Sequence, residues 1–182
     1  MEIDLEQLKY PTGRMPSPAP EEISASALRG YINDIRYLPS LVEIVVQSLD
    51  APQLATPYRP GGWTVAQVVH HLVDSHTNAL TRFKWALTED NPTIKAYNET
   101  AWAELPDVAK TPINISLTLL HALHTRWVNL MEGLTEEQWE RTFVHPESGK
   151  TFALKTVAAN YAWHGKHHLA HIERLKERNN WQ

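Results

Sequence analysis

The chain has 182 residues, of which 42% are hydrophobic and 21% are charged, and this composition is typical of a globular protein with one core of ordinary size. The formal net charge of −4 argues against a nucleic-acid-binding surface, which would be basic, and no apolar run approaches the length of a membrane span. The absence of cysteine excludes disulfides, thiolate metal sites and a cysteine nucleophile.

The N-terminal 20 residues are predicted to form a proline-rich arm. Prolines recur there at four positions, Pro11, Pro16, Pro18 and Pro20. Proline lacks a backbone N–H and restricts the residue before it, so we expect an extended arm or packed strap and no helix, with a frayed terminus as the alternative. The acidic start MEIDLEQLKYPTG lacks the apolar segment of a secretory signal, so we expect a cytoplasmic protein.

The first half of the chain contains two amphipathic patterns. Apolar residues recur at helical spacing over 22–49, and the proline- and glycine-rich stretch 50–63 follows as a loop. Thr64 and Gln67 have the spacing of a capping box, which predicts that a second helix begins there and continues to about residue 89.

The second half adds two more long helices, over 114–132 and about 154–178. The segment 91–107 is predicted to be irregular, with space for one short helical turn. Residues 135–140 are predicted to form a short helix, and the turn at 147–150 to join two short extended pieces. We therefore expect one all-α domain over 1–182. It would be a four-helix bundle with an N-terminal arm and a short irregular or hairpin insertion before the last helix.

Four histidines lie within eight residues of the last helix, in YAWHGKHHLAHIERL. On an ideal helix, His164 and His168 lie one turn apart inside the buried stripe, His167 lies at its rim, and His171 is close enough to remain a candidate. An inward pair at i and i+4 can share one metal ion. The alternative is two core histidines, each bonded to a carbonyl or carboxylate.

A third ligand would come from another helix. In VVHHLVDSH, the same periodicity places His76 inward and His71 on a flank, but a flank can also face a neighbouring helix, so the wheel leaves this choice open. His121 and His124 are predicted to be surface or core polar residues. No role is assigned to His70.

Several motifs together resemble the YfiT branch of the DinB family. The chain carries TPYRPGGWTVAQVVHHLVDSHTN and YAWHGKHHLAHI, with YPTG, RFKWALTE, HTRW and FVHP in the expected order. The resemblance implies a four-helix bundle, usually dimeric, with a metal held by three histidines. The first ligand stands eight residues after Trp63, which selects His71 over His76, and the other two match His164 and His168.

The resemblance also implies an activity. Members of this branch are described as metal-dependent hydrolases, and close relatives as S-transferases that use a low-molecular-weight thiol such as bacillithiol. We therefore expect one divalent ion per subunit, Zn²⁺ before Ni²⁺, that activates water or a thiol against a small electrophilic substrate, in a homodimer. The alternative is a non-catalytic bundle with a structural metal or a ligand-binding role.

Four further residues are candidates near such a site. Asp74 follows His71 by one turn and could orient that imidazole or act as a base, or it could cap a polar face. Tyr161 could hydrogen-bond a substrate or pack in the core. Arg82 and Asn78 could contact an anionic ligand or lie on the surface.

Overall fold

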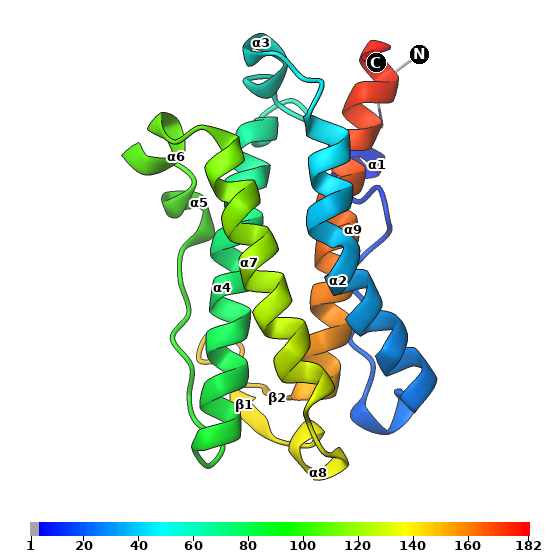
Figure 1. Ribbon diagram of the computed structural model, residues 1–182, viewed down its shortest axis with the longest axis vertical. Coiled ribbons are helices and arrows are strands. Elements are labelled where there is room, and N and C mark those ends of the chain that lie inside the picture. Colours follow the sequence, from blue (N-terminus) through cyan, green and yellow to red (C-terminus); the bar gives the residue numbers. More distant parts are fainter. Residues whose placement is uncertain (1–3) are drawn as a thin grey trace.

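Four long helices lie side by side in the computed structural model, which describes residues 4–182 (Figure 1). They are α2 (Ala25–Val46), α4 (Val65–Thr88), α7 (Ile113–Glu132) and α9 (Leu154–Asn179). Each helix packs against two of the others, so that the order around the bundle is α2, α7, α4 and α9. The predicted four-helix bundle is confirmed. The single domain over 1–182 stays a prediction, because residues 1–3 lie outside the described range.

Short elements connect the long helices. They are α1 (Leu5–Lys9), η1 (Pro20–Glu22), α3 (Ala51–Leu54), α5 (Glu99–Trp102), α6 (Pro106–Lys110), α8 (Glu136–Trp139), β1 (Thr142–Val144) and β2 (Thr151–Ala153). The two strands pair antiparallel, with Thr142 opposite Ala153, and Gly149 takes φ +64° in the turn between them. The predicted hairpin before the last helix is therefore present. The segment 91–107, predicted to be irregular with at most one short helical turn, contains the helical turn α5 and also the start of a second short helix, α6.

The capping box predicted for α4 is present. Thr64 Oγ1 accepts a hydrogen bond from the backbone N–H of Gln67, and the Gln67 side chain accepts one from the N–H of Thr64. A second capping box, between Asp50 and Gln53, begins α3 inside the stretch that was expected to be a loop. These caps satisfy backbone donors that a helix start leaves free.

The N-terminal arm corrects one expectation, because it begins with the helix α1. Pro11 lies beyond this helix, and the Asp4 side chain caps its first turn, so the prolines do not interfere with it. The arm then runs along α9 (Figure 1). Thr156 Oγ1 donates to the carbonyl of Pro18 at 2.9 Å.

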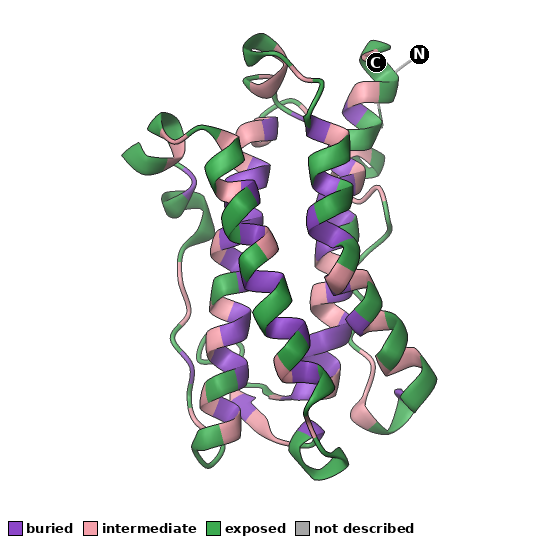
Figure 2. Cartoon of the chain, viewed as in Figure 1, coloured by how far each residue is buried: buried purple, intermediate pink, exposed green. Residues whose placement is uncertain are grey.

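The core consists of two apolar clusters with a polar layer between them. Figure 2 shows that the buried residues face the inside of the bundle. The first cluster includes apolar residues of α4 between 65 and 73 and of α9 between 169 and 175. The second cluster includes apolar residues of α4 between 79 and 86 and of α9 between 154 and 162. His76 of α4 and His164, His167 and His168 of α9 lie between the two clusters along their helices, whereas His70, His71 and His171 lie at the level of the first cluster. Within residues 4–182, no helix has both the length and the apolar character needed to cross a bilayer.

Candidate metal centre

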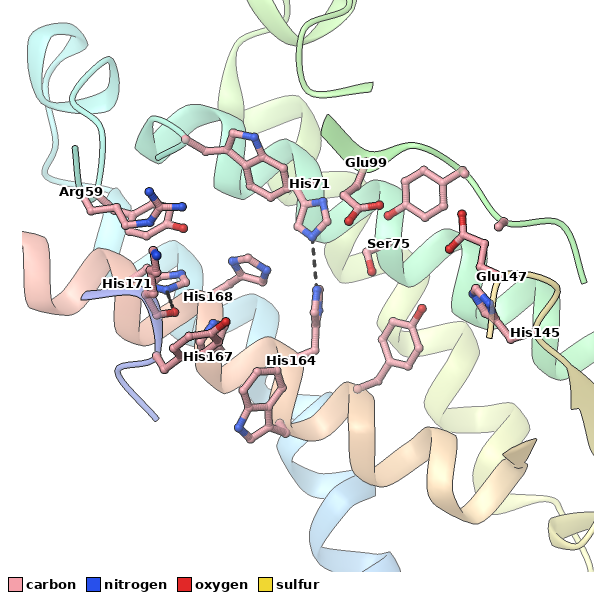
Figure 3. A pocket seen from close by; sticks show the side chains of 18 of the residues that line it. Arg59, His71, Ser75, Glu99, His145, Glu147, His164, His167, His168 and His171 are labelled. Carbon is pink, nitrogen blue, oxygen red and sulfur yellow. Dashed lines mark hydrogen bonds between the residues drawn. The ribbon is translucent and has the colours of Figure 1, made fainter. Parts of the chain in front are cut away.

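Three histidines from two helices converge at the edge of this polar layer. His71 comes from α4, and His164 and His168 come from consecutive turns of α9. One ring nitrogen from each lies within 4.8 Å of the others. Figure 3 shows the three rings turned toward one another, with 3.2 Å between His71 Nε2 and His164 Nε2. His71 and His168 are buried, whereas His164 is half-buried.

One pair of this triad has the spacing that two ligands of a metal ion would have. Two imidazole nitrogens bound to one tetrahedral Zn²⁺, each about 2.0–2.1 Å from the ion, would lie about 3.3 Å apart, close to the separation of His71 and His164. His168 Nδ1 is buried and has no hydrogen-bond partner among residues 4–182. Burying a polar atom without a partner costs free energy. Such a cost is expected where side chains are arranged to hold an ion.

Burial keeps the three rings neutral, which is the form that binds a metal. It lowers the pKa of His71 from its ordinary value to about 4. Burial, together with the neighbouring histidines, holds the pKa of His164 and of His168 well below 6.5. At neutral pH the triad therefore offers three uncharged nitrogen ligands.

The triad lines a cavity of about 650 Å³ (Figure 3). A second cavity of about 400 Å³ adjoins it, because the two share six lining residues: Ser75, Arg82, His145, Glu147, Tyr161 and His164. Burial raises the pKa of Tyr161 and of Tyr97, which lines the larger cavity, so both phenols stay protonated and can donate a hydrogen bond. Space for a small molecule therefore opens directly beside the three imidazoles.

A model of the DinB superfamily matches residues 35–172 of the sequence. The chain belongs to the DinB superfamily. The match takes in all four long helices, except the N-terminal part of α2 and the C-terminal end of α9, and it includes the whole histidine triad.

Relatives and a solved structure agree with this assignment. Proteins from Bacillus cereus (strain 03BB102) and Bacillus thuringiensis subsp. konkukian are each 51% identical over 97% of this chain and 100% of their own length, and carry the name "Putative metal-dependent hydrolase". YfiT from Bacillus subtilis, described as "a probable metal-dependent hydrolase with an unusual four-helix bundle topology", is 43% identical, with a TM-score of 0.93 over 97% of this chain and 99% of its own. The resemblance to the YfiT branch is confirmed.

Behind the triad, this DinB bundle contains a chain of buried histidines. His164 Nδ1 lies 3.1 Å from His76 Nε2, and His76 Nδ1 lies 2.9 Å from His124 Nε2. His124 Nδ1 lies 2.5 Å from the carbonyl of Ile35. Because a carbonyl only accepts, His124 Nδ1 carries the proton and donates to Ile35. A neutral ring has one N–H, so His124 Nε2 accepts from His76 Nδ1–H, and His76 Nε2 in turn accepts from His164 Nδ1–H. His164 Nε2 is then unprotonated and faces the triad.

The helical wheel was right that His76 faces inward, although the resemblance made it the weaker ligand candidate. His76 is fully buried, but it contacts His164 from the side away from His71 and does not belong to the triad. His71 is buried as well, because α4 packs against both α7 and α9 and therefore has two inner faces. His124, expected to be a surface or core polar residue, is also buried, and its Nε2 lies within hydrogen-bond distance of His76.

The prediction that His167 lies at the rim of the buried stripe is wrong, because the N-terminal arm covers it. His167 Nδ1 lies 3.0 Å from Thr12 Oγ1, and His171 Nε2 donates to the carbonyl of Lys9 at 3.1 Å. Both histidines are buried beside the cavity but outside the triad. His70 hydrogen-bonds Ser116 Oγ at 2.7 Å and lines a different cavity.

Asp74 is half-buried, and burial, with a contribution from Asp107, raises its pKa to about 6. Among residues 4–182 no hydrogen bond joins it to His71, and it does not line the cavity beside the triad. The structure therefore does not bring its carboxylate to the imidazoles, and its role as a base or orienting acceptor stays a prediction. Arg82 and Tyr161, in contrast, both line the cavity.

Proposed function

We propose that this chain is a metal-dependent hydrolase in which His71, His164 and His168 hold one divalent metal ion. The observation that carries the proposal is the convergence of three neutral imidazoles, from two helices, at the wall of a cavity. Three imidazoles suit Zn²⁺ and, as a second choice, Ni²⁺. The names of the relatives support the same class of reaction.

When bound, such an ion supplies Lewis-acid polarisation and lowers the pKa of a coordinated water toward neutrality. The chain's own residues would position the reactants. His76 holds the tautomer of His164, and the indole of Trp63, 4.5 Å from the His71 ring, limits the movement of that imidazole. The protonated phenol of Tyr161 can donate a hydrogen bond to a substrate oxygen.

The experiment compares metal-loaded and metal-depleted protein on simple ester and amide substrates, beside a low-molecular-weight thiol with a model electrophile. We expect hydrolysis by the loaded protein, its loss on chelation, and its recovery with added Zn²⁺. His168→Ala should lose metal and activity together. His121→Ala serves as the matched control, because that histidine lies outside the triad and pairs with Glu43.

Three other outcomes would contradict the proposal. Hydrolysis that survives complete metal removal would exclude a metal-dependent reaction. Conjugation that requires the thiol, without hydrolysis, would favour the S-transferase expected from the family resemblance. A sharp fall in melting temperature on chelation, with no turnover on any substrate, would favour the structural-metal alternative.

We also propose that the chain forms a homodimer, as the family resemblance implies. Exposed large apolar side chains gather on two neighbouring helices, at Tyr37, Leu41 and Ile44 of α2 and at Ile115 and Leu119 of α7. Their spacing places each set on one stripe of its helix, so a second copy could cover both. Light scattering after gel filtration tests this: a dimer mass that Ile44→Glu reduces to a monomer mass supports the proposal, and a monomer mass for the wild type contradicts it.

A further inference from the structure

Arg82 is a buried cation that faces the two adjoining cavities. Its exposed fraction is 8%. It follows His71 by 11 residues on α4, which is three turns of an ideal helix and places both residues on one face. Long side chains of a helix lean toward its N-terminus, which for Arg82 is the side on which His71 lies.

The described residues give this guanidinium too few partners. No carboxylate of residues 4–182 lies within 4.0 Å of it. Its one hydrogen bond, from Nη1 to Tyr161 Oη, is long at 3.4 Å, and its buried Nε has no partner. Arginine is rarely buried without an anion, because an unpaired charge loses its hydration without compensation. The cavity wall therefore holds a buried positive charge that no carboxylate of residues 4–182 neutralises.

This unpaired guanidinium lies near the candidate metal centre. Its hydrogen-bond partner Tyr161 precedes His164 by one turn of α9, and the centroids of those two rings are 5.7 Å apart. Arg82 and His164 both line both cavities. Glu147 lines them too, but it is exposed and lies beyond ion-pair distance. An anion held by Arg82 would thus lie in a cavity that His164 of the triad also lines.

The smaller cavity also has an apolar wall, formed by Phe143, Phe152 and Val157. A guanidinium beside an apolar wall suits a molecule with an oxyanion group on a hydrocarbon body. We propose that the substrate of this site carries a carboxylate or a phosphate-type oxyanion that Arg82 binds, with its apolar part against that wall. The claim that the bound molecule is a substrate that reacts at the metal rests on the proposed function. The claim that Arg82 binds an oxyanion does not.

The test is isothermal titration of the Zn²⁺-loaded full chain with benzoate and with phenylphosphonate, and with benzyl alcohol as a neutral probe. We expect Arg82→Gln to weaken binding of the preferred anion about 10- to 100-fold, the range of a charge-assisted hydrogen bond, and to leave benzyl alcohol unchanged. Arg82→Lys should retain part of the affinity. Arg126→Gln, which removes an exposed arginine of α7, is the matched control and should bind like the wild type.

His71→Ala separates this inference from the proposed function. Binding of an anion by Arg82 persists in His71→Ala and is weakened about 10- to 100-fold in Arg82→Gln, whereas an anion bound only to a metal shows the reverse and overturns the inference. The inference also fails if the wild type binds neither anion. Should Arg82→Gln not fold, a crystal structure of the wild type with phenylphosphonate decides: an oxyanion within hydrogen-bond distance of Arg82 supports it, and one elsewhere contradicts it.

Discussion

His76 Nε2 lies 3.1 Å from His164 Nδ1, so a fully buried histidine of α4 contacts a candidate metal ligand of α9 on the side away from the triad. His76 is in turn held by His124, which donates to the carbonyl of Ile35. The result is a continuous polar connection from a backbone carbonyl of α2, through α7 and α4, to the candidate metal centre. Its physical effect is to select one tautomer of His164.

Weakening this connection should weaken metal binding. We expect His76→Gln to lower the affinity for Zn²⁺ about 10- to 100-fold, because partners of ligand histidines typically contribute that much. Competition with a chromophoric chelator measures the affinity, with His121→Gln as the control. Equal affinities for His76→Gln and the wild type would show that the connection does not support the site.

Metal removal should lower the stability of the whole bundle, since the ion would join α4 to α9 in the folded state only. At a free Zn²⁺ concentration 100 times the dissociation constant, the ion contributes about 2.7 kcal/mol. We expect a lower melting temperature after chelation and its recovery on adding Zn²⁺. His168→Ala should melt at the same temperature with and without chelator, and a chelator effect that persists in this variant would place the ion elsewhere.

The stability of the metal-free protein should fall as the pH falls from 7 toward 4. Burial lowers the pKa of His124 from 6.5 to about 4, so the unfolded chain binds a proton in this window before the folded one does. The unfolded state is thereby favoured, by up to about 1.4 kcal/mol per pH unit for each such site. Urea denaturation in the presence of chelator measures the slope. We expect a smaller slope in His124→Gln, and an unchanged slope would mean that His124 titrates alike in both states.

Gly165 lets α9 approach α2 closely. A Cβ added there would lie 2.4 Å from Leu38 Cδ2, and Leu38 is itself buried. Although alanine is the better helix former, we expect Gly165→Ala to destabilise the protein by about 1–3 kcal/mol through overpacking. The matched control is Gly30→Ala, since Gly30 is exposed on α2 with open space around it and its replacement should stabilise the fold by about 0.5–1 kcal/mol.

Thermal or urea unfolding of both glycine variants checks the contrast. The double variant Leu38→Ala with Gly165→Ala should be less destabilised than the sum of its parts, because the smaller side chain removes the overlap. Strict additivity, or a stabilising Gly165→Ala, would show that the helices separate at no cost.

Local patterns in the sequence were sufficient for the main elements of the fold. The apolar spacing predicted α4, α7 and α9 to within one or two residues, and Thr64 with Gln67 marked the start of α4, because both signals depend on neighbours along one helix. The inward pairing of His164 with His168 could be predicted from the sequence for the same reason, because residues four apart on a helix share a face whatever surrounds it.

The tertiary structure decided what the helical wheel alone left open. Choosing between His71 and His76 depends on which neighbour each face of α4 meets, and both are inward because α4 contacts α7 on one side and α9 on the other. The burial of His167 and His171 depends on an arm from more than 150 residues away. Burial and partner choice are properties of contacts between distant segments, and periodicity within a single segment carries no record of them.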